Sequence, residues 1–264
     1  MTAVLEAENV GITFGGLRAL DNVSIRARGG EVLSVIGPNG AGKTTLFNLI
    51  SGIYRPRSGR VMLHGKDVTG LPSHRLARMG LTRTFQNLQV FLRMSAIENV
   101  MAGRHLHLRR NVVAHMLALP SVRRQREESR AKAVACLEAV GLGAYAETPA
   151  GSMPYGALKR LEIARALALE PSVLLLDEPA AGCNPRETEE IDAIIRHIAT
   201  TGVAIVLVEH DMRLVMKISS HIVVLNFGQM LTEGSAAQVK ADPTVIEAYL
   251  GKDAAKGESD AVDR

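Results

Sequence analysis

Residues 37–44 read GPNGAGKT, which is a complete G-x-x-x-x-G-K-[ST] phosphate-binding loop. The apolar residues 31–36 before it predict a buried strand, and residues 44–50 after it have helical spacing. Glycines let the loop curl its amides around phosphate oxygens at a helix N-terminus, where the helix dipole also favours an anion. The sequence therefore predicts a site for a nucleoside triphosphate with Mg²⁺, formed by Gly37, Pro38, Asn39, Gly40, Ala41, Gly42, Lys43, Thr44 and Thr45.

Three side chains of this loop have separate predicted roles. Lys43 reaches the β- and γ-phosphates, Thr44 offers its hydroxyl to Mg²⁺, and Thr45 adds a contact to the α-phosphate. The loop alone leaves GTPases, kinases, helicases and transport ATPases open. The residues that follow it must decide between these classes.

Polar residues follow two further apolar strands. Residues 173–176 lead into Asp177 and Glu178, and residues 203–208 lead into Glu209 and His210. Open α/β sheets bind ligands at the carboxyl edge of their strands, so these side chains are expected beside the phosphate loop. We predict that Asp177 holds Mg²⁺ through water and that Glu178 polarises the attacking water. The alternative is that Asp177-Glu178-Pro179 only ends a strand and begins a turn.

The order and spacing of these motifs resemble the nucleotide-binding subunit of an ATP-binding-cassette (ABC) transporter over nearly the whole chain. The resemblance implies that Gln86, in RTFQN, senses Mg²⁺ and the γ-phosphate, and that His210 contacts the γ-phosphate. It places residues 181–184 in a loop that crosses a dimer interface. Phe14, in ITFGG, falls at the position that stacks on adenine, although an aromatic residue in a short strand is more often part of the core.

The family signature L-S-G-G-Q, which faces the ATP of the opposite subunit, is replaced here by MPYGA at residues 153–157. Pro154 has neither the serine hydroxyl nor a backbone N–H. Tyr155 and Gly156 remain as predicted nucleotide contacts across a dimer, with the Gly156 amide as the donor to the γ-phosphate. The apolar spacing after residue 157 predicts a helix whose N-terminus still points at that site.

Within the ABC family the chain is most similar to the ATP-binding subunits of branched-chain (hydrophobic) amino-acid importers. The similarity rests on RTFQN, PYG with RLEIAR, DEPAAG with NP, and EHDM. Lipopolysaccharide exporters share part of this pattern, so that alternative stays open. The resemblance implies integral-membrane permease subunits as partners, a second ABC ATPase subunit in a homo- or heterodimer, and indirectly a periplasmic or extracellular substrate-binding protein.

The expected fold is α/β: a P-loop NTPase (RecA-like) core with an N-terminal antiparallel β subdomain and an inserted α-helical subdomain. Residues 1–30 and 60–70 alternate apolar and polar residues, which is typical of antiparallel strands. The helical subdomain is expected at about 88–160, with Pro120 separating two segments. We expect a single ABC ATPase domain over residues 1–251 and a flexible C-terminal tail over residues 252–264.

Composition favours a cytoplasmic protein, peripheral on the inner face of the cell membrane. Apolar residues make up 47% of the 264 residues, yet no apolar run approaches the roughly 18 residues of a transmembrane helix. The N-terminus lacks a basic start and an apolar segment, so no secretory signal is expected. Cys136 and Cys183 have no metal-binding spacing and are interpreted as packing residues.

Basic residues gather between residues 104 and 132, within a total of 31 basic and 27 acidic residues. One interpretation is a solvated helical face, and the other is contact with cytoplasmic loops of a membrane protein or with anionic headgroups. No nucleic-acid partner is expected, because aromatic residues make up 3% of the chain and none lies within this basic stretch. A non-transport ABC ATPase and a regulatory module that binds nucleotide without hydrolysis remain as alternatives.

Overall fold

The structure is a computed structural model that describes residues 3–107 and 120–249. The expected tail at 252–264 and the segment just before Pro120 lie outside these residues. Its strands form two sheets. Their bounds are β1 (Ala3–Phe14), β2 (Leu17–Arg28), β3 (Val32–Ile36), β4 (Ser58–Leu63), β5 (Lys66–Asp67), β6 (Leu81–Arg83), β7 (Val173–Asp177), β8 (Ala204–Val208), β9 (His221–Asn226) and β10 (Gln229–Gly234).

The larger sheet has the order β10-β9-β3-β8-β7-β6. Neighbours from β9 to β6 are parallel, and β10 pairs with β9 as an antiparallel edge. Every residue of β3, β7 and β8 is buried, as expected for parallel strands that are covered on both faces. The carboxyl ends of these three strands therefore meet at one edge, where Gly37, Glu178 and Glu209 follow them.

The smaller sheet, β2-β1-β4-β5, is antiparallel. Its side chains alternate between buried and exposed, which confirms the strands predicted from the alternating pattern at the N-terminus. One face of this sheet packs with α1 (Lys43–Ile50) and β3 around a shared core that includes Leu5, Leu20, Phe47 and Val35. The α/β P-loop NTPase fold expected from the sequence is thereby confirmed.

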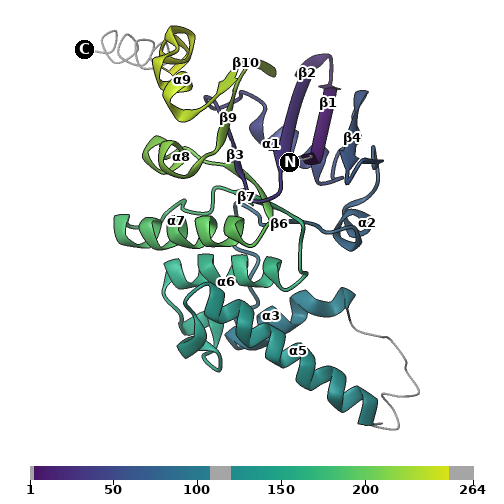
Figure 1. Cartoon of the computed structure of the whole chain (residues 1–264), viewed down its shortest axis with the longest axis vertical. Coiled ribbons are helices and arrows are strands. Elements are labelled where there is room, and N and C mark those ends of the chain that lie inside the picture. The colour runs from purple at the N-terminus through teal and green to yellow at the C-terminus, as the bar shows by residue number, and fades with distance from the viewer. Residues whose placement is uncertain (1–2, 108–119, 250–264) are drawn as a thin grey trace.

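Helices between β6 and β7 lie at the end of the molecule opposite the smaller sheet (Figure 1). They are α3 (Ala96–Gly103), α5 (Pro120–Ala139) and α6 (Tyr155–Leu167), with short 3₁₀ segments at Arg104–Leu106, Gly143–Tyr145 and Ala150–Ser152. Ser95 and Glu98 form a capping box that starts α3. Pro120 is the first residue of α5, where a proline fits without losing a helical hydrogen bond. The subdomain boundaries at 88 and 160 stay a prediction.

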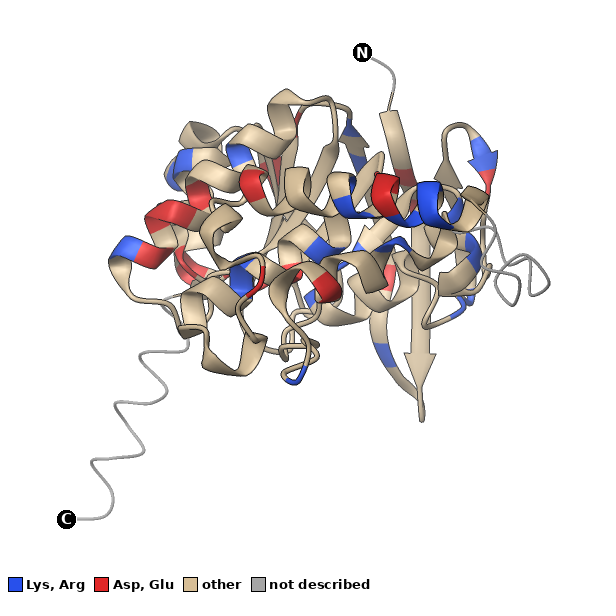
Figure 2. Cartoon of the chain, turned by 90° about the horizontal axis from the view of Figure 1, so that it is seen from below, with Lys and Arg blue, Asp and Glu red and all other residues tan. Residues whose placement is uncertain are grey.

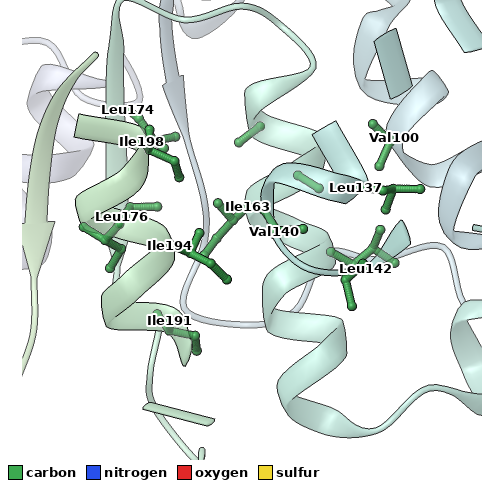
Figure 3. Packing of buried hydrophobic residues seen from close by; sticks show 14 of the residues in the cluster. Val100, Leu137, Val140, Leu142, Ile163, Leu174, Leu176, Ile191, Ile194 and Ile198 are labelled. Atoms are coloured by element: carbon green, nitrogen blue, oxygen red, sulfur yellow. The ribbon is translucent and has the colours of Figure 1, made fainter. Parts of the chain in front are cut away.

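A continuous apolar core joins these helices to the larger sheet. It runs from β7 through α7 (Pro185–Thr200) and α6 to α5 and α3, as Figure 3 shows for Leu176, Ile194, Ile163 and Leu137. The remaining helices are α2 (Ser73–Arg78), α8 (Met212–Ile218) and α9 (Ala236–Ala241). In the described parts of the chain, no helix is both long and apolar enough to cross a membrane.

The basic stretch is less uniform than its sequence suggests. Arg104 is buried and donates to Glu170 and to the Ala168 carbonyl, so it belongs to the interior. Acidic segments interrupt the basic ones along α5 (Figure 2), and salt bridges join Arg123 to Glu127, Arg130 to Glu147, and Lys132 to Glu170. Arg109 and Arg110 lie outside the described residues.

Candidate nucleotide site

The phosphate loop connects β3 to α1 and has the backbone that an anion site requires. Gly37, Gly40 and Gly42 have φ values of 148°, 83° and 102°. A Cβ on Gly37 would lie 2.1 Å from the Leu225 carbonyl oxygen, so no other residue fits there. Helix α1 starts after Gly42 with no side-chain cap, which leaves its first amides for a ligand.

Lys43 lies at the base of this loop and is buried. Its Nζ donates to the carbonyl oxygens of Gly37 at 2.6 Å and Pro38 at 3.1 Å. These bonds hold the ammonium under the loop, from which it can turn toward phosphate oxygens. Thr44, in contrast, is exposed at the start of α1.

A cavity of about 530 Å³ opens above the loop. Gln86, Glu178 and His210 line it together with the loop, so the two predicted strand-end residues come together there with the residue that the family resemblance pointed to. Leu17, Arg18, Ala19, Phe227 and Gly228 complete its lining on the other side. Phe227 is 81% exposed, and it was not predicted because it lies in a turn far from any recognised motif.

Glu178 connects the other two predicted catalytic residues. Its carboxylate accepts from Gln86 Nε2 at 2.9 Å and contacts His210 Nε2 at 2.7 Å. Its backbone has φ 49°, a left-handed conformation that a non-glycine residue adopts only where its surroundings impose it. The peptide N–H of Glu178 donates to the Val208 carbonyl at 2.9 Å. Because β7 lies between β6 and β8 in the sheet, Glu178 reaches the residue that follows β6, Gln86, and the residue that follows β8, His210.

Asp177, the last residue of β7, is buried and does not line the cavity. Arg83 Nη2 lies 2.7 Å from its Oδ2, and the hydroxyl of Thr84 accepts from its backbone N–H at 3.3 Å. Sequence reasoning missed Arg83. The only signal was a charged residue next to the predicted glutamine loop.

Glu209 was expected at this edge of the sheet, but sequence reasoning gave it no role. Its carboxylate accepts from the backbone N–H groups of Ala180 at 2.9 Å and His210 at 3.0 Å. Burial raises the pKa of Glu209, while these backbone donors act against that rise. Glu209 thus joins the turn after Glu178 to the backbone that carries His210.

The signature segment lies outside the lining of this cavity. Tyr155 donates its hydroxyl to the Ala181 carbonyl at 3.2 Å, which connects the segment to the predicted interface loop. A Cβ on Gly156 would lie 2.5 Å from the Glu187 carboxylate, so a side chain there would displace this carboxylate of α7. The roles of Tyr155 and Gly156 toward a nucleotide stay predictions.

Phe14 is not brought to the cavity either. Its ring packs edge-on against Tyr54, with centroids 5.2 Å apart, and it is absent from the cavity lining. Leu17, from the other side of the same hairpin turn, lies at the cavity instead. The adenine-stacking role of Phe14 stays a prediction.

The residues predicted to hold Mg²⁺ offer suitable donors. Thr44 and Gln86 line the cavity and contribute a hydroxyl and an amide oxygen, and oxygen ligands are those that Mg²⁺ prefers. The Asp177 carboxylate lies outside the lining and pairs with Arg83, so it fits the predicted contact through water rather than direct coordination. The uncapped start of α1 would supply the phosphate oxygens with amides beside them. The described residues hold no cluster of three or more His, Cys, Asp or Glu side chains suited to a metal.

The fold and this site together define a phosphate-loop nucleoside triphosphatase. Comparison with known proteins narrows the class: the chain belongs to the ABC transporter family, whose model matches residues 20–181. It is an ATPase cassette that binds nucleotide. A second model, described as a branched-chain amino acid ATP-binding cassette transporter, matches residues 229–255.

Three curated relatives match nearly the full length. The chain is 45% identical to the high-affinity branched-chain amino acid transport ATP-binding protein BraF of Pseudomonas aeruginosa, over 94% of this chain and 98% of BraF. It is 43% identical to LivG of Escherichia coli K12, with the same coverage. It is also 36% identical to the lipopolysaccharide export ATP-binding protein LptB of Acidithiobacillus ferridurans, over 95% and 98% of the two chains.

Solved structures agree with this assignment. The ADP conformation of an ATP-binding cassette of an ABC transporter superposes with a TM-score of 0.83 at 32% identity, covering 95% of this chain and all of the other. A dimeric cassette bound to ADP and Pi superposes with a TM-score of 0.73 at 25% identity, covering 88% and 98%.

Proposed function

We propose that this chain is the ATP-hydrolysing subunit of an importer for branched-chain amino acids and works at the cytoplasmic face of the cell membrane. The observation that carries the catalytic part is the contact of Glu178 with both Gln86 and His210 beside the phosphate loop. The similarity to BraF and LivG, and the match of residues 229–255, support the cargo class over lipopolysaccharide.

In the proposed reaction ATP binds with its phosphates in the loop and Lys43 on the β- and γ-phosphates. Thr44 and Gln86, with Asp177 acting through water, would hold Mg²⁺, which would neutralise charge on the phosphates when bound. Glu178 accepts a proton from the attacking water, and His210 Nε2 donates to the γ-phosphate. The Gln86 amide, which donates to Glu178 at 2.9 Å, orients that carboxylate.

We further propose that two cassettes, identical or homologous, clamp two ATP molecules head to tail. The Gly156 amide of each would face the γ-phosphate bound by the other. Pro154 removes one donor from this contact, because it has no hydroxyl and no N–H. The helix dipole of α6 retains part of the attraction for the anion, since α6 begins at Tyr155 without a side-chain cap.

A permease subunit would dock in a cavity of about 630 Å³ between β6 and the helices α3 and α6. Phe85 and Phe91 line this cavity and are 43% and 51% exposed, which is unusual for large aromatic side chains with no partner to cover them. Phe85 immediately precedes Gln86. A partner in this cavity could therefore move the glutamine loop and so change the contact between Gln86 and Glu178.

Co-purification tests the transport assignment. A tagged Glu178→Gln chain, isolated with ATP and Mg²⁺ from detergent-solubilised membranes of the source cell, should bring down two multi-span permeases and a second cassette. Phe91→Asp in the same background should release the permeases, because it places a charge in the docking cavity. Ile246→Asp is the matched control, since Ile246 is 48% exposed but lies outside that cavity. Recovery of ribosomes or DNA-associated proteins instead would remove transport from the proposal.

Uptake tests the cargo separately. Cells whose own copy carries Lys43→Ala should lose uptake of labelled leucine, isoleucine and valine, and should keep normal lipopolysaccharide at the surface. Normal amino-acid uptake together with defective lipopolysaccharide export would show that the cargo is lipopolysaccharide and not branched-chain amino acids. The ATPase assignment would survive that outcome.

A further inference from the structure

Lys159 is a buried cation that the proposed reaction does not use. It lies on α6, two residues after the signature segment, and is 2% exposed. It does not line the nucleotide cavity. A lysine is seldom buried to this degree, because removing an ammonium from water is costly unless acceptors replace the lost hydration.

The acceptors of Lys159 are the backbones of two predicted catalytic residues. Nζ donates to the carbonyl oxygen of Gln86 at 3.3 Å and to that of Glu178 at 3.4 Å. It also lies 5.9 Å from the centroid of the Tyr155 ring, within the range of a cation–π contact. One side chain of α6 therefore holds together the two chain segments whose side chains meet at 2.9 Å.

Both peptide groups of Glu178 are fixed from outside its own strand. Its N–H donates to Val208 of β8, and its carbonyl accepts both from the Ala181 N–H of the following turn at 3.1 Å and from Lys159 of α6 at 3.4 Å. A non-glycine residue at φ 49° has a conformational cost of roughly 1–3 kcal/mol, and such conformations persist where the surroundings over-determine them. The bond from Lys159 is one of the contacts that keep the Glu178 backbone in this conformation.

We propose that Lys159 is a positioning residue for ATP hydrolysis, which ties the signature helix to the backbones of Gln86 and Glu178 and so sets where their side chains meet. A displacement of α6 would then change the relative position of the Gln86 and Glu178 side chains. The inference rests on the role proposed for Glu178.

Substitution of Lys159 in the purified full-length chain tests this. Lys159→Met keeps the length of the side chain and removes its charge and donors. We expect kcat for ATP to fall about 10- to 100-fold, as a small misplacement of a catalytic group does, while the Kd for ATP stays within about twofold. Lys159→Arg keeps a cation with donors and should recover most of the loss.

Arg160→Met is the matched control. Arg160 is the next residue of α6 and pairs with Glu190 of α7 at 3.3 Å, so it also connects α6 to a neighbour, yet it has no bond to Gln86 or Glu178. It should lower thermal stability about as much as Lys159→Met and leave kcat unchanged. A purely structural role for Lys159 would give both variants the same kcat.

Three results would overturn the proposal. They are an unchanged kcat in Lys159→Met, a parallel loss of ATP affinity and kcat, and a loss of kcat that Lys159→Arg does not repair. If Lys159→Met does not fold, Lys159→Gln retains a neutral donor and the same comparison applies to it. Glu178→Gln is measured in parallel: full turnover by that variant would remove the catalytic assignment itself, whereas its inactivity with an unchanged Lys159→Met would remove only the positioning role.

Discussion

Arg83 and Asp177 form a buried ion pair, with Arg83 Nη2 2.7 Å from Asp177 Oδ2 and side-chain exposures of 7% and 4%. Arg83 also donates from Nη1 to the Asn48 side chain at 2.7 Å, and its guanidinium stacks on Phe47 and Phe85. It therefore joins β6 and β7 to the helix that follows the phosphate loop. The same guanidinium lines the proposed docking cavity, so this pair connects that cavity with the predicted magnesium carboxylate.

Removing Arg83 should destabilise the protein strongly. Arg83→Met leaves the Asp177 carboxylate buried without its partner, and such a change costs about 3–5 kcal/mol. Urea unfolding followed by circular dichroism measures the free energy of unfolding. Arg186→Met is the control, because Arg186 pairs with Glu190 at 3.5 Å while its side chain is 89% exposed, and such pairs contribute about 0–1 kcal/mol. Equal losses in the two variants would contradict a special role for the buried pair.

Glu178→Gln should separate ATP binding from ATP turnover. The amide cannot accept the proton of the attacking water, so we expect kcat to fall about 10²- to 10⁴-fold with ATP affinity retained. Lys43→Ala should lose both, because it removes a phosphate contact. Phosphate release and binding of a fluorescent ATP analogue measure the two quantities.

The control for this prediction is Glu233→Gln. Glu233 also faces a histidine, His221, at 3.1 Å, but it is half exposed and lies outside the nucleotide cavity. This variant should hydrolyse ATP at the parent rate. Parent-level turnover by Glu178→Gln would exclude Glu178 as the catalytic base.

Gly37→Ala should be far more damaging than an alanine at another left-handed glycine. The new Cβ would lie 2.1 Å from a backbone oxygen of β9, so the loop or the strand has to move. Gly65→Ala is the matched control, because Gly65 has φ 71° with no atom within 4 Å of the added Cβ. Gly65→Ala should cost only the backbone strain of about 1–2 kcal/mol. Denaturant midpoints compare the two, and similar midpoints would contradict the steric role of Gly37.

Glu209 should make stability depend on pH. Burial raises its pKa in the folded state, so below the ordinary pKa of a glutamate both states hold the proton. Between that value and the raised pKa the unfolded state releases its proton first, and the free energy of unfolding falls as pH rises. The side chain of Glu209→Gln does not titrate, so its free energy of unfolding does not have this dependence on pH. The free energy of unfolding of the variant minus that of the parent should therefore rise over the same pH interval and then level off. The difference in Tm between the two proteins, recorded from pH 4 upward, should show this rise; a difference that stays constant with pH would contradict it.

Local sequence rules predicted the main elements of the larger sheet. The apolar runs of β3, β7 and β8 are buried over their whole length, and α1 follows the phosphate loop as expected. These elements are predictable because a short run of apolar residues that ends in glycine or a carboxylate is typical of a buried strand in a parallel sheet. The meeting of Glu178 and His210 was also predictable, since parallel strands end at one edge, whereas Gln86 was expected there only from the resemblance to ABC cassettes.

The neighbours of the buried charges were not predictable in this way. Lys159 stands in a helical pattern where a lysine normally faces solvent, and Arg104 stands among basic residues that suggest a surface, yet both are buried. The contact of Phe14 with Tyr54 was not foreseen either, because these two residues come from segments 40 positions apart. The burial of Lys159 and Arg104 and the contact of Phe14 depend on which helix or strand from elsewhere in the chain covers each residue. The periodicity of the local sequence does not indicate that neighbour.

By itself, the sequence determined that this chain has a phosphate loop, a carboxylate pair at a strand end and the order of motifs of an ABC cassette. Each of these depends on a few consecutive residues and on the backbone conformation that they favour. Only the tertiary structure decided which cation holds Asp177 and which side chain holds the backbones of Gln86 and Glu178. Those contacts join residues 94, 73 and 19 positions apart. They exist because β6 lies next to β7 and α6 packs across both, which is a property of the strand order and of the helices above it.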